Sequence, residues 1–308
     1  MNRQMKLVLF QVLLLALLLS SCSLAPVSDE DAGLELRAAT FTSLDLERAY
    51  FIGAYASVGA YDTRTDAATR TSSTKRDSSA EAAINSLKKH GWTIRNYEKT
   101  GAVDGDFFKL DAQYLLATKS EGGKNVYVVA FRGSEFNLSD WAGSDFDILP
   151  VKFLSTGTLV HRGFLQYTMP AYNNSTLRST LAKVKADANA MLIVTGHSLG
   201  GAAATLYGAM AVEYGVPKAR INIITFVQPA VGQPAFETRY TAAFNCYVSV
   251  VRLGDVVVVS TTAANYRQFG TKIQASGSIN PATAHSKDAY LTLAKSKAPQ
   301  YAGSWGAD

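Results

Sequence analysis

Residues 195–201 read Thr-Gly-His-Ser-Leu-Gly-Gly and directly follow an apolar run at 191–194. Glycine destabilises a helix by about 1 kcal/mol relative to alanine, and it also weakens strands. Three glycines at one junction therefore indicate a backbone that turns sharply or approaches another segment closely. The pattern Gly-x-Ser-x-Gly between a strand and a helix is typical of a tight turn with an exposed serine. We predict a strand over 191–195, a helix over 199–214, and Ser198 at the tip between them; a purely structural turn is the alternative.

Elsewhere in the chain, short apolar runs alternate with segments in which apolar residues recur at helical spacing. Strands that alternate with helices are joined by right-handed crossovers into a mostly parallel sheet. Two strand-like runs flank the turn sequence Ser-Glu-Gly-Gly-Lys at 120–124, which predicts an antiparallel hairpin before that sheet. The expected fold is therefore α/β, with helices on both faces of a mostly parallel central sheet and an antiparallel N-terminal part. The expected strands are 112–118, 125–131, 221–227 and 246–253, and the expected helices are 43–61, 80–90, 164–190 (broken near Pro170 or at 173–174) and 236–243.

Ser198 is a poor nucleophile unless a base takes its proton and an acid orients that base. Of the four histidines, His285 comes last in the chain, where the final loop of the sheet is expected. His90 ends a polar helix and is expected to be exposed, His161 precedes the serine, and the His197 side chain is expected to point away from the serine's. The chain order serine, acid, histidine is the one used by the α/β-hydrolase fold, which selects His285.

Asp255 is the only aspartate between this serine and this histidine, and it follows the strand expected at 246–253 through a single glycine. The carboxyl end of a strand is where the acid of such a triad is expected. Glu213 and Glu237 are the competing acids, and both fall within expected helices. The alternative role for Asp255 is that of an aspartate that stabilises a turn.

Acyl transfer also needs N–H donors for the negatively charged oxygen of its intermediate. The first donor is expected at Leu199, the residue after the serine. The second is expected in the loop after an earlier strand, where the strand at 128–131 is followed by Arg132, Gly133 and Ser134. We assign Ser134 to this place through its N–H, with its hydroxyl as a further donor.

Four motifs together resemble the class 3 lipases, the family of the filamentous-fungal triacylglycerol lipases. They are Phe-Arg-Gly-Ser at 131–134, His-Arg-Gly-Phe at 161–164, the stretch 195–201, and Thr-Phe-Val-Gln-Pro-Ala-Val-Gly at 225–232. The resemblance extends over about residues 43–295, nearly all of the chain that follows the export signal described below. The sequence departs from the family at 256–259, where four valines stand in place of the usual prolines, and it has no disulfide framework.

This resemblance implies an α/β-hydrolase fold, hydrolysis of carboxylic esters and no cofactor. It implies that Ser198 is the nucleophile, His285 the base and Asp255 the orienting acid. It also implies that Ser134 and Leu199 form the oxyanion hole.

In the family a short helical lid follows the oxyanion serine, and here residues 135–149 intersperse apolar side chains with aspartates. An amphipathic segment at that place would cover the site in water and open on lipid. The alternative is a loop whose aromatic side chains pack against the protein. The residues assigned to the lid are Phe136, Leu138, Trp141 and Phe146.

The first residues have the composition of an export signal. Arg3 and Lys6 precede an apolar run at 7–19 that is too short to span a membrane as a helix. Leu-Ser-Ser-Cys at 19–22 is similar to the lipobox of bacterial lipoproteins. This similarity implies a signal peptide at 1–21, a lipid on Cys22, membrane anchoring, and sorting to the outer membrane in a Gram-negative cell.

Ordinary secretion after cleavage near Ser23 is the alternative fate. Residues 22–42 are polar and weakly patterned, which predicts a tether, and residues 43–308 are expected to form a single domain. A lipid on Cys22 leaves Cys246 as the one free thiol, so no intramolecular disulfide is expected. Cys246 lies in an apolar run and is expected to be buried.

Composition narrows the possible partners. The chain has 308 residues, of which 47% are hydrophobic and 18% charged, with a formal net charge of +5. No block of Lys and Arg is of the kind that grips nucleic acid, so nucleic acid is not an expected partner. No group of His and Cys has the spacing of metal ligands, so no metal is expected. A monomer is expected.

The leading hypothesis is a serine carboxylic-ester hydrolase that acts on lipid esters through an acyl-enzyme. Its expected partners are a lipid or other ester substrate and a membrane, reached through Cys22 and the lid. A phospholipase A1 and a short-chain or feruloyl-type esterase use the same chemistry and stay open as alternatives. A different class, a catalytically silent lipid-binding surface lipoprotein, is disfavoured because Ser198, Asp255 and His285 are all present in order.

Overall fold

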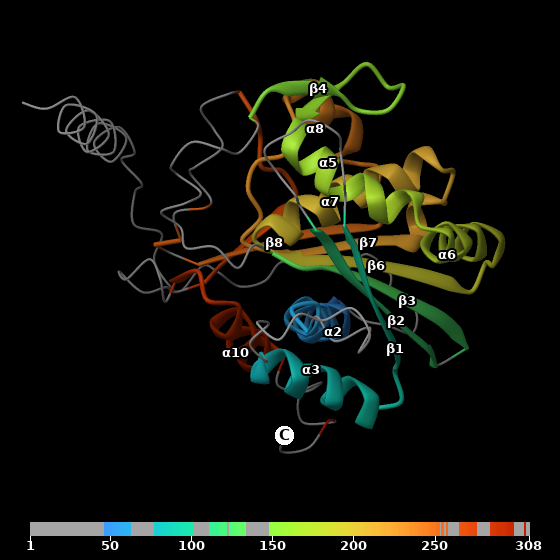
Figure 1. Ribbon diagram of the computed structural model, residues 1–308, viewed down its shortest axis with the longest axis vertical. Helices are drawn as coiled ribbons and strands as arrows, with labels where there is room; N and C mark the ends of the chain where they lie inside the picture. The colour runs from blue at the N-terminus through green and yellow to red at the C-terminus, as the bar shows by residue number, and fades with distance from the viewer. Residues whose placement is uncertain are drawn as a thin grey trace, which may run out of the picture. The chain divides into compact units, whose positions relative to one another are not determined.

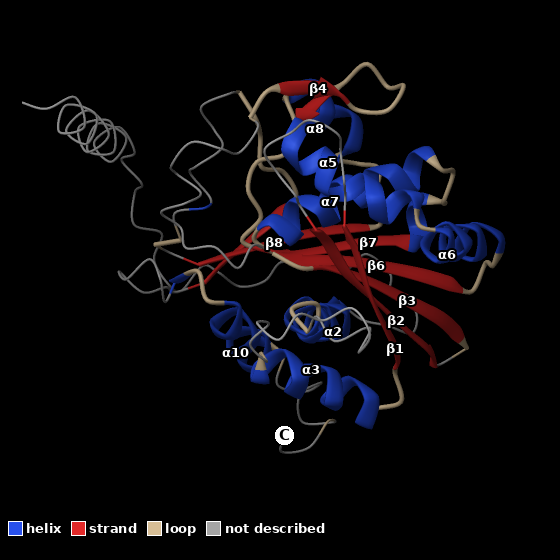
Figure 2. Ribbon diagram, in the orientation of Figure 1, coloured by secondary structure: helices blue, strands red, loops and turns tan. Residues whose placement is uncertain are grey.

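A seven-stranded sheet forms the centre of the computed structural model (Figures 1 and 2). In spatial order its strands are β1 (Thr93–Thr100), β2 (Asp111–Glu121), β3 (Lys124–Phe131), β6 (Ala190–His197), β7 (Ile221–Phe226), β8 (Cys246–Arg252) and β9 (Thr271–Ala275). The first three strands pair antiparallel, whereas β3 and the four strands after it pair parallel. The expected mostly parallel sheet with an antiparallel N-terminal part is therefore confirmed.

The structure describes residues 46–62, 77–100, 111–121, 123–133, 148–252, 254–255, 257, 265–275, 284–298 and 305. All of them fall within one unit of the chain, Ala38–Asp308. The export signal, Cys22 and the tether predicted at 22–42 lie outside the described residues.

Helices cover both faces of the sheet, as Figures 1 and 2 show. One face carries α5 (Arg162–Asn173), α6 (Ser175–Ala186), α7 (Leu199–Glu213) and α8 (Pro234–Tyr240). The other face carries α2 (Leu46–Gly59), α3 (Ser78–Lys89) and α10 (Lys287–Lys297). Successive residues of β6 point to alternate faces, so Leu192 and Val194 pack with the first group while Met191 and Ile193 pack with the second.

The central strands explain why the sequence shows continuous apolar runs there. Every residue of β6 and of β7 is buried, because helices lie on both sides of these strands. Helix α2 is buried along nearly all its length, since it lies between the sheet and the helices α3 and α10. It approaches β6 so closely that the Thr195 hydroxyl donates a hydrogen bond to the Gly53 carbonyl at 3.1 Å.

Of the two breaks expected within 164–190, the one at 173–174 is confirmed. Helix α5 continues through Pro170, and the Asn174 side chain accepts hydrogen bonds from the amides of Thr176 and Leu177 and so caps α6. Other elements differ from the sequence-based expectations. The strands β1 and β9 and the helix α10 were not expected, because their sequences are polar and lie at or beyond the edge of the sheet. A small second sheet, β4 (Pro150–Lys152) with β5 (Leu159–His161), and a short 3-10 helix, η1 (Lys218–Arg220), complete the described elements.

Candidate active site

Ser198 lies at the sharp turn between β6 and α7, with φ 58° and ψ −125°. This backbone region is rare for a residue with a side chain and costs of order 1–3 kcal/mol, so the surroundings must impose it. The Ser198 amide donates to the Phe226 carbonyl of β7 at 2.9 Å. A Cβ at Gly196 would collide with the carbonyl of Gly200, and one at Gly200 would collide with the carbonyl of Phe131. The glycines of the motif are therefore needed for close approach of three backbone segments.

The structure brings the three residues predicted to form the triad into one chain of hydrogen bonds. The Ser198 Oγ lies 3.0 Å from His285 Nε2, and His285 Nδ1 lies 3.0 Å and 3.1 Å from the two carboxylate oxygens of Asp255. Asp255 has a fully buried side chain, whereas 18% of the His285 side chain is exposed. The serine hydroxyl is thus linked through an imidazole to a buried carboxylate, which is the arrangement that activates a serine nucleophile.

Two further groups hold the Asp255 carboxylate. The Val257 amide donates to its Oδ1 at 3.1 Å, and the Tyr290 hydroxyl donates to its Oδ2 at 3.0 Å. The Arg252 amide in turn donates to the Tyr290 oxygen at 3.1 Å, which leaves the tyrosine proton for the carboxylate. Burial and the adjacent Asp255 raise the pKa of Tyr290, so the hydroxyl keeps its proton. Tyr290 lies on α10, and no motif in the sequence marks it.

Leu199 is the first residue of α7 and is buried. Within the described part of the chain its amide has no hydrogen-bond acceptor, so the donor at the positive end of the helix is available. Ser134 lies outside the described residues, as do Phe136, Leu138, Trp141 and Phe146 of the predicted lid. The preceding residue, Gly133, is described, and a Cβ there would lie 3.3 Å from Ser198 Cβ. The chain that leads to Ser134 therefore passes directly beside the serine.

The other histidines take structural roles. His161 is buried, stacks on Phe164 with ring centroids 3.9 Å apart, and accepts a hydrogen bond from that residue's amide at the start of α5. His90 was expected to be exposed, and this expectation is wrong. Its ring stacks on Trp305 at 4.0 Å and its nitrogens lie 2.8 Å and 3.1 Å from the carbonyls of Ser86 and Trp305. A residue near the C-terminus covers it, which sequence spacing does not reveal.

His197, the neighbour of the serine, is buried and faces away from it. Its Nε2 lies 2.9 Å from the His285 carbonyl oxygen, and its Nδ1 lies 2.9 Å from the Tyr61 hydroxyl. A carbonyl only accepts, so Nε2 carries the proton and Nδ1 accepts from Tyr61. Burial, together with the nearby His285, lowers the pKa of His197 well below its usual value. His197 is therefore a neutral group that binds the backbone of the histidine of the triad.

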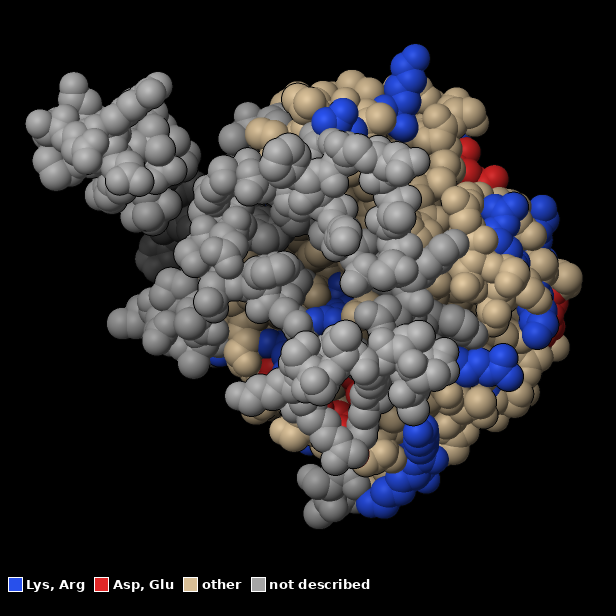
Figure 3. Space-filling view, viewed as in Figure 1, with Lys and Arg blue, Asp and Glu red and all other residues tan. Residues whose placement is uncertain are grey.

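The described residues show no metal centre, and the described part of the face in Figure 3 shows no concentrated charge. Among them, no group of three or more His, Cys, Asp or Glu side chains is placed to hold a metal ion. On the described part of the face in Figure 3, Lys and Arg side chains stand in separate small groups. None of the helices in the described ranges combines the length and apolarity needed to cross a bilayer. Burial raises the pKa of the Cys246 thiol to about 12, so this cysteine stays protonated.

This fold and this hydrogen-bonded Ser-His-Asp chain define an α/β-hydrolase-fold protein with a serine triad. Solved structures show the same fold. The native Rhizomucor miehei lipase propeptide complex aligns with a TM-score of 0.55 at 23% identity, covering 74% of this chain and 67% of that one. A triacylglycerol lipase whose catalytic centre is described as a serine protease triad aligns with a TM-score of 0.55 at 23% identity, covering 77% and 82%.

Residues 128–264 match the family described as Lipase (class 3). The matched residues include Ser198 and Asp255 but end before His285. The match confirms the family resemblance seen in the sequence motifs.

Individual relatives extend over a similar part of the chain. The Rhizomucor miehei lipase is 32% identical over 145 residues, which cover 46% of this chain and 39% of the relative. A triacylglycerol lipase of Arabidopsis thaliana is 29% identical over 191 residues, covering 48% and 36%. A phospholipase A1 of Oryza sativa subsp. japonica is 31% identical over 193 residues, covering 52% and 47%. The chain thus spans less than half the length of each of these curated relatives.

Replacement of Asp255 with asparagine tests the buried carboxylate. An amide no longer fixes which nitrogen of His285 carries the proton, so kcat is expected to fall by about 10³- to 10⁴-fold. The rate is measured on a soluble p-nitrophenyl ester, with folding checked by circular dichroism. Asp187→Asn, at the C-cap of α6 and away from the triad's hydrogen bonds, is the matched control and should keep the wild-type rate. A folded D255N protein with the wild-type rate would exclude Asp255 as the orienting acid.

The depressed pKa of His197 predicts a dependence of stability on pH. In the unfolded state His197 has a pKa near 6.5 and binds a proton below that pH, whereas in the folded state it stays neutral. The stability that neutral His197 contributes is therefore fully present above about pH 6.5 and is lost as the pH falls below it. Between pH 7 and pH 5 the free energy of unfolding should fall by about 1.5–2 kcal/mol more in the wild type than in His197→Gln, which keeps an N–H donor. Urea unfolding at both pH values measures this difference, and equal losses in the two proteins would contradict it.

Proposed function

We propose that the protein is a serine carboxylic-ester hydrolase that acts on lipid esters. The observation that carries the proposal is the Ser198–His285–Asp255 chain of hydrogen bonds at a strained strand-to-helix turn. The class 3 lipase match over residues 128–264 supports lipid esters as the substrate class. The relatives named as a lipase, a triacylglycerol lipase and a phospholipase A1 support the same class of substrate.

In the proposed reaction the Ser198 oxygen attacks the ester carbonyl carbon while His285 Nε2 takes the hydroxyl proton. The carbonyl oxygen becomes an oxyanion, to which the amides of Leu199 and Ser134 donate. The intermediate collapses, His285 gives the proton to the departing alcohol oxygen, and an acyl-serine is left. Water, deprotonated by the same nitrogen, then attacks the acyl-serine, releases the carboxylic acid and restores Ser198. Asp255 holds the imidazole in the required tautomer throughout.

Exposed apolar surface at the end of the predicted lid supports acyl chains as ligands. Ile148 and Leu149 are 56% and 55% exposed, and they end the segment predicted to be a lid. The Ile148 carbonyl is fixed by a 2.7 Å hydrogen bond from the Tyr266 hydroxyl, so this exposed pair has a defined place. Apolar side chains held in solvent suit contact with a lipid phase. Phospholipase A1 activity is the second candidate function, favoured by the 31% identity to the rice phospholipase A1.

A panel of esters tests the proposed activity. Residues 23–308 are assayed on p-nitrophenyl esters from acetate to palmitate, on emulsified triacylglycerol and on phosphatidylcholine, with Ser198→Ala in parallel. We expect the rate to rise with chain length and with emulsion, and to fall by about 10⁴-fold or more in the variant. Activity confined to short soluble esters would leave the triad chemistry and remove lipid esters. No Ser198-dependent hydrolysis of any ester would favour a silent binding lipoprotein.

We also propose that the protein is exported and anchored to a membrane by a lipid on Cys22. The support is the sequence alone: a charged start, an apolar run at 7–19, and Leu-Ser-Ser-Cys at 19–22. In this proposal residues 22–42 tether the domain at 43–308, and in a Gram-negative cell the anchor lies in the outer membrane. A tethered hydrolase would meet lipid substrate at the surface to which it is bound.

The anchor is tested by expressing the full chain and Cys22→Ala in a bacterial host supplied with labelled palmitate. The wild type should carry label and sediment with the membranes, whereas the variant should carry none, because only the cysteine accepts the lipid. Cys246→Ala is the matched control and should remain labelled. Release of unlabelled wild-type protein into the medium would favour ordinary secretion.

A further inference from the structure

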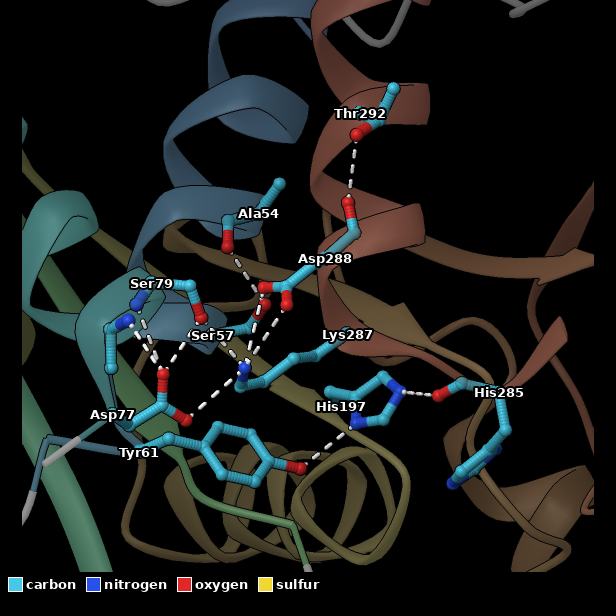
Figure 4. A network of polar contacts seen from close by, with 11 residues as sticks. Ala54, Ser57, Tyr61, Asp77, Ser79, His197, His285, Lys287, Asp288 and Thr292 are labelled. Atoms are coloured by element: carbon cyan, nitrogen blue, oxygen red, sulfur yellow. Dashed lines mark hydrogen bonds and ion pairs between the residues drawn. The ribbon is translucent and has the colours of Figure 1, made fainter. Parts of the chain in front are cut away.

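Two separate polar links tie the backbone around His285 to the N-terminal helices, and Figure 4 shows both. In the first link the His285 carbonyl accepts from His197, whose other nitrogen accepts from the Tyr61 hydroxyl. Tyr61 lies just beyond the end of α2. In the second link Lys287, two residues after His285, binds residues at the start of α3.

The second link is a compact and largely shielded ion pair. The Lys287 ammonium lies 3.1 Å from Asp77 Oδ2 and donates to the Ser79 hydroxyl at 2.7 Å, and only 16% of its side chain is exposed. It also lies 3.3 Å from the more exposed Asp288 carboxylate. Lys287 is the first residue of α10, so this pair fixes the start of the helix that directly follows His285.

Asp77 is itself held in place by α3. It is the N-cap of that helix, and its Oδ1 accepts from the amides of Ser79 and Ala80 at 3.1 Å each. This leaves Oδ2 for Lys287. Partial burial acts to raise the pKa of Asp77, but the hydrogen bonds from Ser79 and Ala80 and the charge of Lys287 lower it overall. The Asp77 carboxylate is therefore ionised at neutral pH.

The two links meet at Tyr61. The Lys287 ammonium lies 5.5 Å from the centroid of the Tyr61 ring, within the range of a cation–π contact, while the hydroxyl of the same ring binds His197. The buried Tyr61 ring thus contacts both His197, which binds the His285 carbonyl, and Lys287. The short segment that carries the catalytic histidine is held from both of its ends.

We propose that Lys287 and Asp77 form a positioning pair that, together with the Tyr61–His197 contact, holds the catalytic His285 within reach of Ser198. This inference rests on the proposed function, because it assigns the pair to the base of that reaction. Stability alone is a weak reason for such a pair, since withdrawing two charges from water offsets most of their attraction. A shift of the imidazole by about 1 Å can lower a rate by about 10²-fold.

The test measures the activation of Ser198 directly, as its rate of covalent labelling by a fluorophosphonate, with kcat and KM for p-nitrophenyl butyrate alongside. Lys287→Met and Asp77→Asn should each lower the labelling rate and kcat by about tenfold with KM within about twofold. Lys287→Arg should restore most of the rate. Lys295→Met is the matched control, because Lys295 lies on the same helix and over the Tyr55 ring at 5.4 Å, and it should label at the wild-type rate.

The outcomes are separable. A wild-type protein that is not labelled contradicts the proposed function itself. A labelled wild type with K287M and D77N at the same rate overturns the positioning pair. Asparagine is as good an N-cap as aspartate, so D77N keeps α3 capped and reports on the pair even where K287M unfolds. The double variant should be no slower than the slower single variant, and multiplied losses would show that the two residues do not act as a pair.

Discussion

The close approach of backbones beneath Ser198 is the constraint on which the rest of the site depends. Ser198 has a positive φ, which is unfavourable for a residue with a side chain. It is held there by the ends of β6 and β7 and the first turn of α7. The approach is possible only because Gly196 and Gly200 have no side chain. The strain is maintained because β6 and β7 are fully buried and cannot relax.

Parallel pairing then determines what lies next to the serine. The strands β3, β6 and β8 run in the same direction, and Phe131 at the end of β3 pairs with Gly196 near the end of β6. Residues that follow these strands must therefore emerge at one edge of the sheet. Gly133, Ser198 and Asp255 come from three such exits, although more than one hundred residues separate the first from the last. The order of the strands is thus sufficient to bring a donor loop, a nucleophile and an acid together.

How much of the site follows from the sequence depends on whether a residue is marked by local chemistry. Ser198 was predictable because few structures other than a sharp strand-to-helix turn require its pattern of glycines. Asp255 was predictable because it is the only aspartate between Ser198 and His285. The structure places them with His285 as expected. Tyr290 was not predictable, because a tyrosine on a short helix has no spacing that points to a carboxylate thirty-five residues earlier.

The same reasoning explains the misplaced elements. The strands β1 and β9 have mixed, half-exposed sequences because they lie at the edges of the sheet, where one side of the strand needs no partner. Of the two expected breaks, the one at Asn174 is confirmed, because its side-chain oxygen caps a new helix, whereas Pro170 lies within α5. The exposure of His90 depended on Trp305, whose packing across the chain no local pattern encodes.

The residues of the site therefore come from two parts of the chain that are held in place in different ways. The region that matches the class 3 lipases, residues 128–264, contains Ser198 and Asp255 on the edge of a rigid sheet. His285 lies outside that region, on a segment whose neighbours are α2, α3 and α10. Residues at the end of a strand are held by the backbone hydrogen bonds of the sheet. His285 lies between β9 and α10, outside the sheet, so other contacts must hold it. Buried polar links, one through a neutral imidazole and one through a shielded ion pair, supply that support without adding chemistry to the site.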